Sequence, residues 1–457
     1  MFNKKNICIV GCGYVGLALG LCLAYFGNTV KFVEKDNKRL DLLRKGQMPF
    51  FEPQIERMLK LTKKDVKFYS KLKFAIKNAE IIFISVGTPA GQDGSIDDSQ
   101  VENVVKRVLQ IIMPDSEALI VIKSTVPIGT TQYLNCKLKE IAGENSWLEI
   151  AYNPEFLREG TSIFDMLYPD RVVFGCASPR AQMLLKEVYE PILRQDFFPP
   201  EELVKPKAFG RPFLLATDPA TAELIKFAAN AFLAIKISFI NEMAAFCEKI
   251  GADIKLLSKG IGLDKRIGPH FLQAGIGWGG SCLGKDTSAL VWQAGNLGID
   301  LLLVKGARKV NESLKDLVIN KLEKYLNGLS KKTVGILGLS FKPNTDDLRE
   351  APSLNIINSL INKGVSVKAY DPVAVGACAS QYPDLNISYA DNFIALAARC
   401  DALVLATEWD EFKTMPLADM ARVMNQRIFL DGRNFLESST VRAAGFIYLG
   451  IGANNTE

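Results

Sequence analysis

A cysteine inside a glycine-rich segment is the first feature of the sequence that could do chemistry. Cys282 lies in GIGWGGSCLGKD at residues 275–286, which holds five glycines and ends on Lys285 and Asp286. A backbone without side chains lets a substrate approach the sulfur, and a nearby ammonium favours the thiolate, which is the reactive form of the thiol. The pattern predicts a catalytic cysteine rather than a merely packed one.

Two polar residues on a long apolar helix could serve the same chemistry. The segment 218–251 begins with Asp218-Pro219, a cap and first turn, and ends on a glycine, which predicts one helix of unusual length. Lys226 and Asn230 are four positions apart and project from one face of it. An ammonium beside an amide could stabilise an oxyanion, and the alternative is a pair of ordinary structural polar groups.

Two further segments carry polar residues suited to a site. KSTVP at residues 123–127 places a Ser-Thr cluster at the end of a predicted strand, and NPEFLREG at residues 153–160 carries Glu155 and Glu159.

The run Gly11-Cys12-Gly13-Tyr14-Val15-Gly16 follows the first predicted strand and opens a helix, which is the context of a dinucleotide fingerprint. Gly11 allows the tight turn, Gly13 lets a pyrophosphate approach, and Gly16 lets the helix lie close to the sheet. Glu34 ends the second strand, where its carboxylate would bind ribose hydroxyls and repel a 2′-phosphate. We therefore expect NAD rather than NADP, against the alternative of a βα turn that binds nothing.

The C-terminal part repeats this arrangement without the fingerprint. Gly338-Leu339-Ser340-Phe341 stands where the glycines should be, and Asp371 ends the second strand there. A mononucleotide carried by the substrate would suit this unit, with Lys342 and Arg433 at strand ends to meet phosphates or, equally, to be solvated.

Composition excludes several classes of protein. The 457 residues are 48% hydrophobic and 23% charged with a net charge of +5, which is ordinary globular usage and weak support for a nucleic acid or membrane partner. The single histidine, His270, disfavours a Ser-His-Asp triad or a multi-histidine metal site, and we expect no metal. Nine cysteines without a C-x-x-C pair predict a reducing, cytoplasmic setting.

The elements that must position these residues follow from hydrophobic periodicity. Short buried runs alternate with helical stretches at both ends of the chain, which predicts an α/β protein with two Rossmann-like parallel-sheet domains joined by a long central helix. We expect an NAD domain at 1–210, a central helical domain with the cysteine loop at 211–310, and a second Rossmann-like domain at 311–457. The long helix is apolar around much of its circumference, so either a second copy packs on it in a dimer or both α/β domains cover it.

With these segments in hand, the sequence resembles the nucleotide-sugar 6-dehydrogenases, the UDP-glucose/GDP-mannose dehydrogenase family. The resemblance covers nearly the whole chain and keeps the family's order through GCGYVG, VGTP, KSTVP, NPEFLREG, the PDR at 169–171, KFAANAF, RIGPHFLQAGIGWGGSC, KD, FKPNTDDLREAPS, YDP and DGRN. It implies an NAD domain, a central helix forming the core of a homodimer or higher oligomer, and a C-terminal domain binding uridine diphosphate. The implied reaction takes the 6-hydroxyl of UDP-glucose to aldehyde and then to acid, giving UDP-glucuronate with two NAD consumed.

The resemblance also implies residue roles. Cys282 would capture the aldehyde as a thiohemiacetal whose oxidation gives a thioester, with Lys226 and Asn230 stabilising the oxyanion. Water would be held by Asp286 with Thr125, and Glu155 would act in hydrolysis. The implied cofactor contacts are Gly11, Gly13, Tyr14, Val15, Gly16, Glu34, Thr88, Thr125, Glu159, Lys285 and Arg349. The implied substrate contacts are Phe156, Leu157, Lys226, Asn230, Arg266 (to a neighbouring subunit), Phe271, Gly279, Lys342 and Arg433.

Three positions depart from the family's usual pattern. Glu34 replaces a frequent Asp, Leu283-Gly284 replaces Phe-Pro beside the cysteine, and His270 replaces a frequent Lys. The alternative functions are a GDP-mannose 6-dehydrogenase or another nucleotide-sugar 6-dehydrogenase and, from a different class, a dinucleotide-binding sensor without catalysis. The PDR, YDP and DGRN segments favour uridine.

Overall fold

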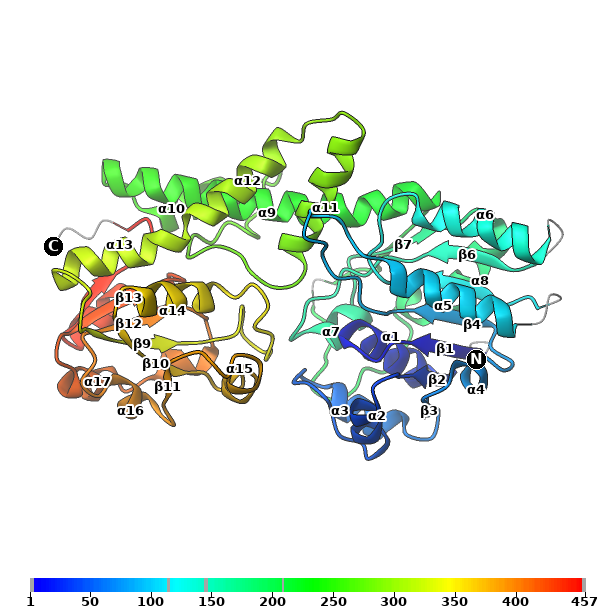
Figure 1. Cartoon of the computed structure of the whole chain (residues 1–457), viewed down its shortest axis with the longest axis horizontal. Helices are drawn as coiled ribbons and strands as arrows, with labels where there is room; N and C mark the ends of the chain where they lie inside the picture. Colours follow the sequence, from blue (N-terminus) through cyan, green and yellow to red (C-terminus); the bar gives the residue numbers. More distant parts are fainter. Residues whose placement is uncertain (1–3, 113–115, 144–146, 208, 454–457) are drawn as a thin grey trace. The chain divides into compact units, whose positions relative to one another are not determined.

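The computed structural model describes residues 4–112, 116–143, 147–207 and 209–453, and the chain divides into two compact units, Met1–Ala228 and Ala229–Glu457 (Figure 1). Each unit is built on its own sheet. The three-domain division expected from the sequence stays a prediction.

The first unit alternates strands and helices along most of its length. Its elements are β1 (Asn6–Val10), α1 (Tyr14–Tyr25), β2 (Thr29–Val33), α2 (Asn37–Arg44), α3 (Ile55–Thr62), β3 (Val66–Tyr69), α4 (Leu72–Ala75), β4 (Ile81–Ile84), α5 (Ser99–Ile111), β5 (Leu119–Ile122), α6 (Thr130–Ala142), β6 (Glu149–Tyr152), α7 (Ser162–Leu167), β7 (Arg171–Gly175), α8 (Pro179–Arg194) and β8 (Phe213–Thr217).

The first sheet has the strand order β3-β2-β1-β4-β5-β6-β7-β8. Its first six strands follow the doubly wound order of dinucleotide-binding folds. All pairs are parallel except β6 with β7, which meet antiparallel at Tyr152 and Gly175. The sheet is therefore mixed at one contact, where the sequence alone predicted parallel pairing.

Both faces of this sheet are covered, because side chains alternate along each strand. Ile7 and Ile9 pack with α1, α3, α7 and α8, whereas Cys8 and Val10 pack with α5 and α6. This double burial explains the continuous apolar runs read from the sequence.

The second unit takes up the long helix and continues to the C-terminus. Its elements are α9 (Pro219–Ile250, whose first turns belong to the first unit), α10 (Ile254–Gly262), α11 (Leu283–Asn296), α12 (Leu302–Ser313), α13 (Lys315–Leu326), β9 (Thr333–Leu337), α14 (Pro352–Asn362), β10 (Ser366–Tyr370), α15 (Val375–Gln381), β11 (Ser388–Tyr389), α16 (Phe393–Ala397), β12 (Ala402–Leu405), a 3₁₀ turn (Asp410–Thr414), α17 (Leu417–Val423), β13 (Ile428–Asp431), α18 (Ser438–Ala443) and β14 (Ile447–Leu449).

The second sheet, β11-β10-β9-β12-β13-β14, is parallel throughout and repeats the strand order of the first six strands of unit one. Helices cover both faces, with α13 and α14 on one and α16, α17 and α18 on the other. Two Rossmann-like sheets and the long helix confirm the predicted fold class.

Helix α9 runs within one residue of the predicted limits at each end. Phe232, Phe239 and Phe246 recur every seven residues along it and are exposed. Among the described residues, no helix combines the length and the apolar character that a membrane crossing requires.

Candidate active site

The loop after β1 has the geometry of a pyrophosphate site. Gly11 has φ +104°, and a Cβ there would lie 2.3 Å from the Ser85 carbonyl oxygen. A Cβ on Gly16 would lie 2.0 Å from the Gly11 oxygen, so the chain itself requires both glycines. Gly13 instead faces open space within 4 Å and directly precedes α1. Space at Gly13 beside the amides of a helix N-terminus suits an anionic phosphate group, so the residues present fit a dinucleotide.

Glu34 stands at the edge of this loop. It is buried, its backbone amide donates to the Tyr69 oxygen, and its Oε1 accepts from the amide of Asp36 at 2.9 Å. Thr88 and Thr125 lie in the loops after the strands β4 and β5 and are buried and half-buried, respectively. These residues follow the carboxyl ends of β2, β4 and β5, the edge at which open α/β sheets bind ligands.

A buried ion pair forms the polar centre of the first unit. Lys226 Nζ lies 2.7 Å from Glu155 Oε1, with side chains 4% and 10% exposed. Glu155 Oε2 accepts from the Leu157 amide at 2.7 Å. Burial alone would raise the pKa of Glu155, but the Lys226 ammonium and the Leu157 amide hold that pKa below its usual value. Glu155 is therefore a carboxylate at neutral pH, and Lys226 is no surface lysine.

Aromatic contacts frame the pair. The centre of the Phe156 ring lies 5.7 Å from Lys226 Nζ and 3.8 Å from the guanidinium carbon of Arg171.

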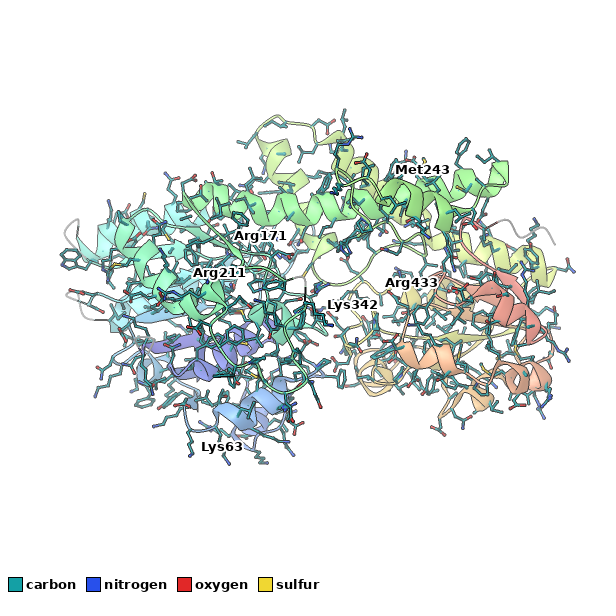
Figure 2. The ribbon with its side chains drawn as sticks, turned by 180° about the vertical axis from the view of Figure 1, so that it is seen from behind. Lys63, Arg171, Arg211, Met243, Lys342 and Arg433 are labelled. Atoms are coloured by element: carbon teal, nitrogen blue, oxygen red, sulfur yellow. The ribbon has the colours of Figure 1, made fainter. Side chains whose placement is uncertain are left out.

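The cationic residues labelled in Figure 2 are divided between the two units. Arg171 belongs to the first unit, as does Arg211, whereas Lys342 and Arg433 belong to the second. Glu159, a predicted cofactor contact on the same loop, is half-buried.

One residue of this region was missed in the sequence. Lys123 is buried and donates to Asn153 Oδ1, to the Pro154 oxygen and to the Tyr189 hydroxyl. The sequence feature that could have revealed it is a lysine directly after a strand that is buried at every position. A lysine is rarely buried unless its ammonium is paired.

The second unit carries Cys282 at the start of a helix. The thiol is exposed, Cys282 is the N-cap residue of α11, and Ser281 Oγ lies 3.6 Å from its sulfur. The positive end of a helix stabilises a thiolate at this position. Of the nine cysteines, none of which is in a disulfide, only Cys136 shares this exposure.

A polar network lies in the first turn of α11. Asp286 is buried, and its two carboxylate oxygens each receive a donor at 2.6 Å, Lys285 Nζ at one and Asn230 Nδ2 at the other. The Lys285 ammonium, expected near the thiolate, thus forms an ion pair with Asp286. Asn230 and Asp286, separated by 56 positions in sequence, are brought together as a catalytic group would require.

The glycines around Cys282 have a packing reason of their own. A Cβ on Gly277 would lie 2.4 Å from Asn311 Oδ1, one on Gly280 would lie 2.6 Å from the Phe341 ring, and one on Gly284 would lie 1.9 Å from Glu350 Oε2. Other residues of the chain therefore lie where these three glycines would carry a Cβ, and the access of a substrate to Cys282 stays a prediction. The last contact also gives a reason for glycine in Leu283-Gly284, since Glu350 occupies the position of a side chain.

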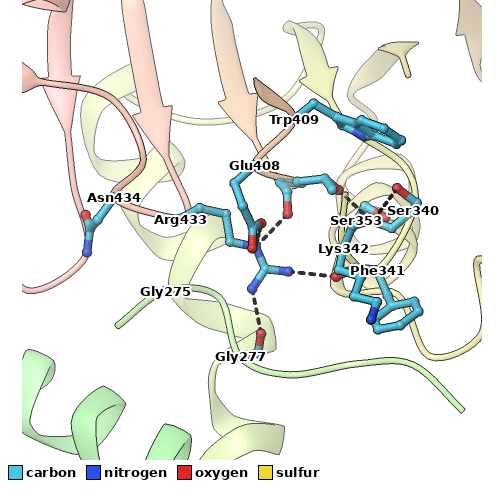
Figure 3. Close-up of polar contacts among 12 residues, drawn as sticks. Gly275, Gly277, Ser340, Phe341, Lys342, Ser353, Glu408, Trp409, Arg433 and Asn434 are labelled. Atoms are coloured by element: carbon cyan, nitrogen blue, oxygen red, sulfur yellow. Dashed lines mark hydrogen bonds and ion pairs between the residues drawn. The ribbon is translucent and has the colours of Figure 1, made fainter. Parts of the chain in front are cut away.

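Arg433 ties the cysteine loop to the second sheet. Its guanidinium donates to the Gly277 oxygen at 2.8 Å, to the Ala406 oxygen at 2.8 Å and to the Phe341 oxygen at 3.3 Å, with Glu408 3.3 Å away (Figure 3). Lys342 Nζ lies 5.3 Å from the centre of the Phe341 ring. Arg433 thus braces the backbone around the cysteine loop, and its contact with a phosphate stays a prediction.

Two other predicted arginines are paired within their own loops. Arg266 binds Asp264 and Arg349 binds Asp347, each at 2.6 Å, with side chains 89% and 54% exposed. Phe271 is half-buried with φ +64°, and Gly279 is half-buried. The structure therefore groups the predicted residues in two sets, one in each unit, and their functional roles stay predictions.

Three family models match successive parts of the chain. The NAD-binding domain of the UDP-glucose/GDP-mannose dehydrogenase family matches residues 5–193, its central domain 220–313, and its UDP-binding domain 335–438. The chain belongs to this family. NAD is the cofactor of the UDP-glucose/GDP-mannose dehydrogenases, in agreement with the open loop at Gly13, and the chain is an NAD-dependent oxidoreductase.

Relatives within the UDP-glucose/GDP-mannose dehydrogenase family are similar to this chain over nearly all of their length. A UDP-glucose 6-dehydrogenase of Bacillus subtilis is 40% identical over 98% of this chain and 97% of its own, and one of Pseudomonas aeruginosa is 39% identical with the same coverage. A solved UDP-glucose dehydrogenase of Pyrobaculum islandicum is 33% identical with a TM-score of 0.87, covering 99% of this chain and 98% of that one. A solved UDP-D-ManNAc dehydrogenase of Pyrococcus horikoshii is 27% identical with a TM-score of 0.82, covering 98% and 100%.

Proposed function

We propose that this chain is a UDP-glucose 6-dehydrogenase that oxidises UDP-glucose to UDP-glucuronate through a covalent cysteine intermediate. The observation that carries the proposal is the exposed thiol of Cys282 at the helix N-terminus, next to a buried Asp286 that is held by Asn230. A dehydrogenase that releases an aldehyde has no need of such a nucleophile.

The chemistry divides into two oxidations and one hydrolysis. Bound NAD, held at the loop of Gly11 to Gly16, would supply the hydride acceptor for each oxidation. The Cys282 thiolate adds to the aldehyde carbon to give a thiohemiacetal, whose alkoxide Asn230 and Lys226 stabilise as hydrogen-bond donors. Loss of hydride from this species leaves a thioester on Cys282. Water then attacks the thioester carbon, and the thiolate leaves as the acid is released.

The remaining residues bind and move protons. Asp286, with Thr125, would hold the water, and Glu155 would take part in acid–base chemistry of the hydrolysis, for which its carboxylate state at neutral pH fits proton acceptance. Glu34 would bind the ribose hydroxyls and exclude a 2′-phosphate. Lys342, Arg433 and Phe271 would serve the nucleotide-sugar in the second unit.

We also propose a homodimer, or a higher oligomer, built on α9. The exposed stripe of Phe232, Phe239 and Phe246 supports it, because large apolar side chains at a seven-residue spacing suit packing against another helix. The absence of disulfides among all nine cysteines supports a cytoplasmic setting.

The deciding experiment measures NADH and uronic acid formed per nucleotide sugar consumed, with UDP-glucose, GDP-mannose and UDP-N-acetylhexosamines compared. Two NADH per UDP-glucose without free aldehyde is the expected result. Preference for GDP-mannose would move the chain to the alternative dehydrogenase, and NAD binding without NADH formation from any sugar would make it a sensor.

A further inference from the structure

Lys123 is a buried cation at the ligand-binding edge of the first sheet. It directly follows β5, and the residue is 4% exposed. The three donors of its ammonium meet three acceptors, Asn153 Oδ1 at 3.0 Å, the Pro154 oxygen at 3.1 Å and the Tyr189 hydroxyl at 3.2 Å. All three acceptors are neutral, so the ammonium has its hydrogen bonds but none of these acceptors compensates its positive charge.

These contacts fix the backbone from which Glu155 extends. Tyr189 donates its hydroxyl proton to the same Asn153 Oδ1 at 2.6 Å, and Asn153 Nδ2 donates to the Val173 oxygen at 2.8 Å. Asn153 and Pro154 directly precede Glu155, so Lys123 ties β5, α8 and β7 to the turn that presents this carboxylate.

The charges around Lys123 belong to the ion pair described above. The groups that face it are the Glu155 carboxylate, the Lys226 ammonium and the neutral phenol of Tyr189. Glu155 gives one oxygen to Lys226 and the other to the Leu157 amide. The Glu155 carboxylate therefore interacts with two buried lysines. Its interaction with Lys226 is a direct ion pair, and its interaction with Lys123 is electrostatic without a hydrogen bond.

We propose that Lys123 is a positioning residue for the oxidation proposed above: it holds residues 153–154 beneath Glu155 and sets the charge felt by the Glu155–Lys226 pair. The inference rests on the proposed function, and it assigns Lys123 no contact with substrate.

Titration of Lys123 gives the proposal a measurable signature. Burial, opposed by the Glu155 carboxylate and assisted by the Lys226 ammonium, lowers the pKa of Lys123 to about 7. Lys123 thus changes from ammonium to amine near neutrality. Loss of this positive charge makes Glu155 a stronger proton acceptor, so turnover should rise as the pH increases through about 7.

Tyr189→Phe is the most informative variant, because it removes one acceptor of the ammonium and leaves all charged groups in place. Losing that acceptor disfavours the ammonium, so the inflection in kcat should move to lower pH, by roughly half a unit or more. An inflection that belongs to Cys282 would not move. Lys186→Met, at an exposed position on the same helix α8, is the matched control and should keep the parent profile.

Lys123→Met removes both the charge and the hydrogen bonds. We expect the inflection to disappear and kcat at pH 7 to fall by up to about 100-fold, the scale on which a misplacement of about 1 Å slows a reaction. The KM values for UDP-glucose and NAD should change far less. If this variant fails to fold, Tyr189→Phe decides.

The outcomes separate the two proposals. A parent enzyme that yields two NADH per UDP-glucose, together with a Tyr189→Phe profile that superimposes on the parent's, overturns the role of Lys123 alone. A parent that does not yield two NADH overturns the proposed function and this inference with it. A shifted profile with parental stoichiometry supports both.

Discussion

The two Rossmann-like units make the same turn after their first strand and then diverge. Gly11 and Gly338 have φ values of +104° and +92°, and their amides donate to the last residue of the neighbouring strand at 3.0 and 2.8 Å. A Cβ on either would lie 2.3 Å from the segment that follows the fourth strand of its sheet order. The shared turn is thus a property of the strand order, not of a ligand.

The segments after the turn differ between the two units. In the first unit α1 begins at Tyr14, three residues after Gly11, whereas in the second unit α14 begins only at Pro352. Asp371 Oδ2 accepts hydrogen bonds from the amides of Leu339 and Ser340 at 2.7 and 3.2 Å. These two loop amides therefore bind the carboxylate that follows the second strand of their own unit.

Glu34, the acid at the corresponding position of the first unit, accepts from the Asp36 amide, which is not part of the glycine loop. A Rossmann strand order therefore does not by itself make a dinucleotide site. In this chain the first unit, where the helix starts directly after the turn, is the one with space for a phosphate at Gly13.

The largest expected effect concerns the thiol of Cys282 in the second unit. Cys282→Ala should lower four-electron turnover by on the order of 10³-fold or more, because no other group can carry the acyl intermediate. NAD and UDP-glucose should still bind, as calorimetry can measure. Cys136→Ser is the matched control. Continued formation of two NADH per sugar by the alanine variant would exclude the covalent route.

The next effect concerns the buried pair of the first unit. Lys226→Ala should lower kcat roughly 10²- to 10³-fold through loss of an oxyanion donor. It should also destabilise the protein by about 3–5 kcal/mol, because Glu155 stays buried without its partner. In Lys226→Ala/Glu155→Gln, the melting temperature should recover while activity does not. Recovery of activity in the double variant would show that Lys226 acts only in folding.

A pair of glycine substitutions tests the comparison itself. Gly13→Ala should weaken NAD binding about tenfold or more, roughly 1.4 kcal/mol, with little change in melting temperature, because its Cβ meets nothing in the protein. Gly338→Ala should lower stability by about 1–3 kcal/mol, from its positive φ and its contact with Thr407, and leave NAD affinity unchanged. The reverse pattern would contradict the division into an open and a closed loop.

The last effect is a pH dependence of stability in the first unit. The pKa of Lys123 is about 7 when folded and near 10.5 when unfolded, so between these values the unfolded chain holds the extra proton. Stability should therefore rise with pH in this window. Melting temperatures of the parent and of Lys123→Met at pH 7.5 and 9.5 would reveal it. A difference that does not change with pH would mean that Lys123 keeps an ordinary pKa.

Sequence reasoning recovers the features that one residue type or spacing determines. The strands are predictable because burial on both faces demands unbroken apolar runs, and Gly11 and Gly16 because their neighbours leave no room for a side chain. The antiparallel contact of β6 with β7 is not predictable, since it depends on how the chain returns after α7.

Features that depend on distant partners escape it. Lys123 looks like any lysine at a strand end until Asn153 and Tyr189 are known to surround it. The glycines near Cys282 look like access for substrate, although Asn311, Phe341 and Glu350 lie against them. Arg433 looks like a free cation, although its donors meet backbone oxygens.

Because most of the cysteines are buried, a thiol titration could measure the concentration of active sites. Burial raises the pKa of Cys8 to about 12 and that of Cys400 to about 11, so neither thiol reacts readily near neutral pH. A chromogenic disulfide reagent should therefore detect two fast thiols per chain, Cys136 and Cys282, and a single one after Cys136→Ser. That remaining thiol is the proposed nucleophile itself, so the colour released would give the concentration of intact active sites, and rates could be expressed per working centre rather than per milligram of protein.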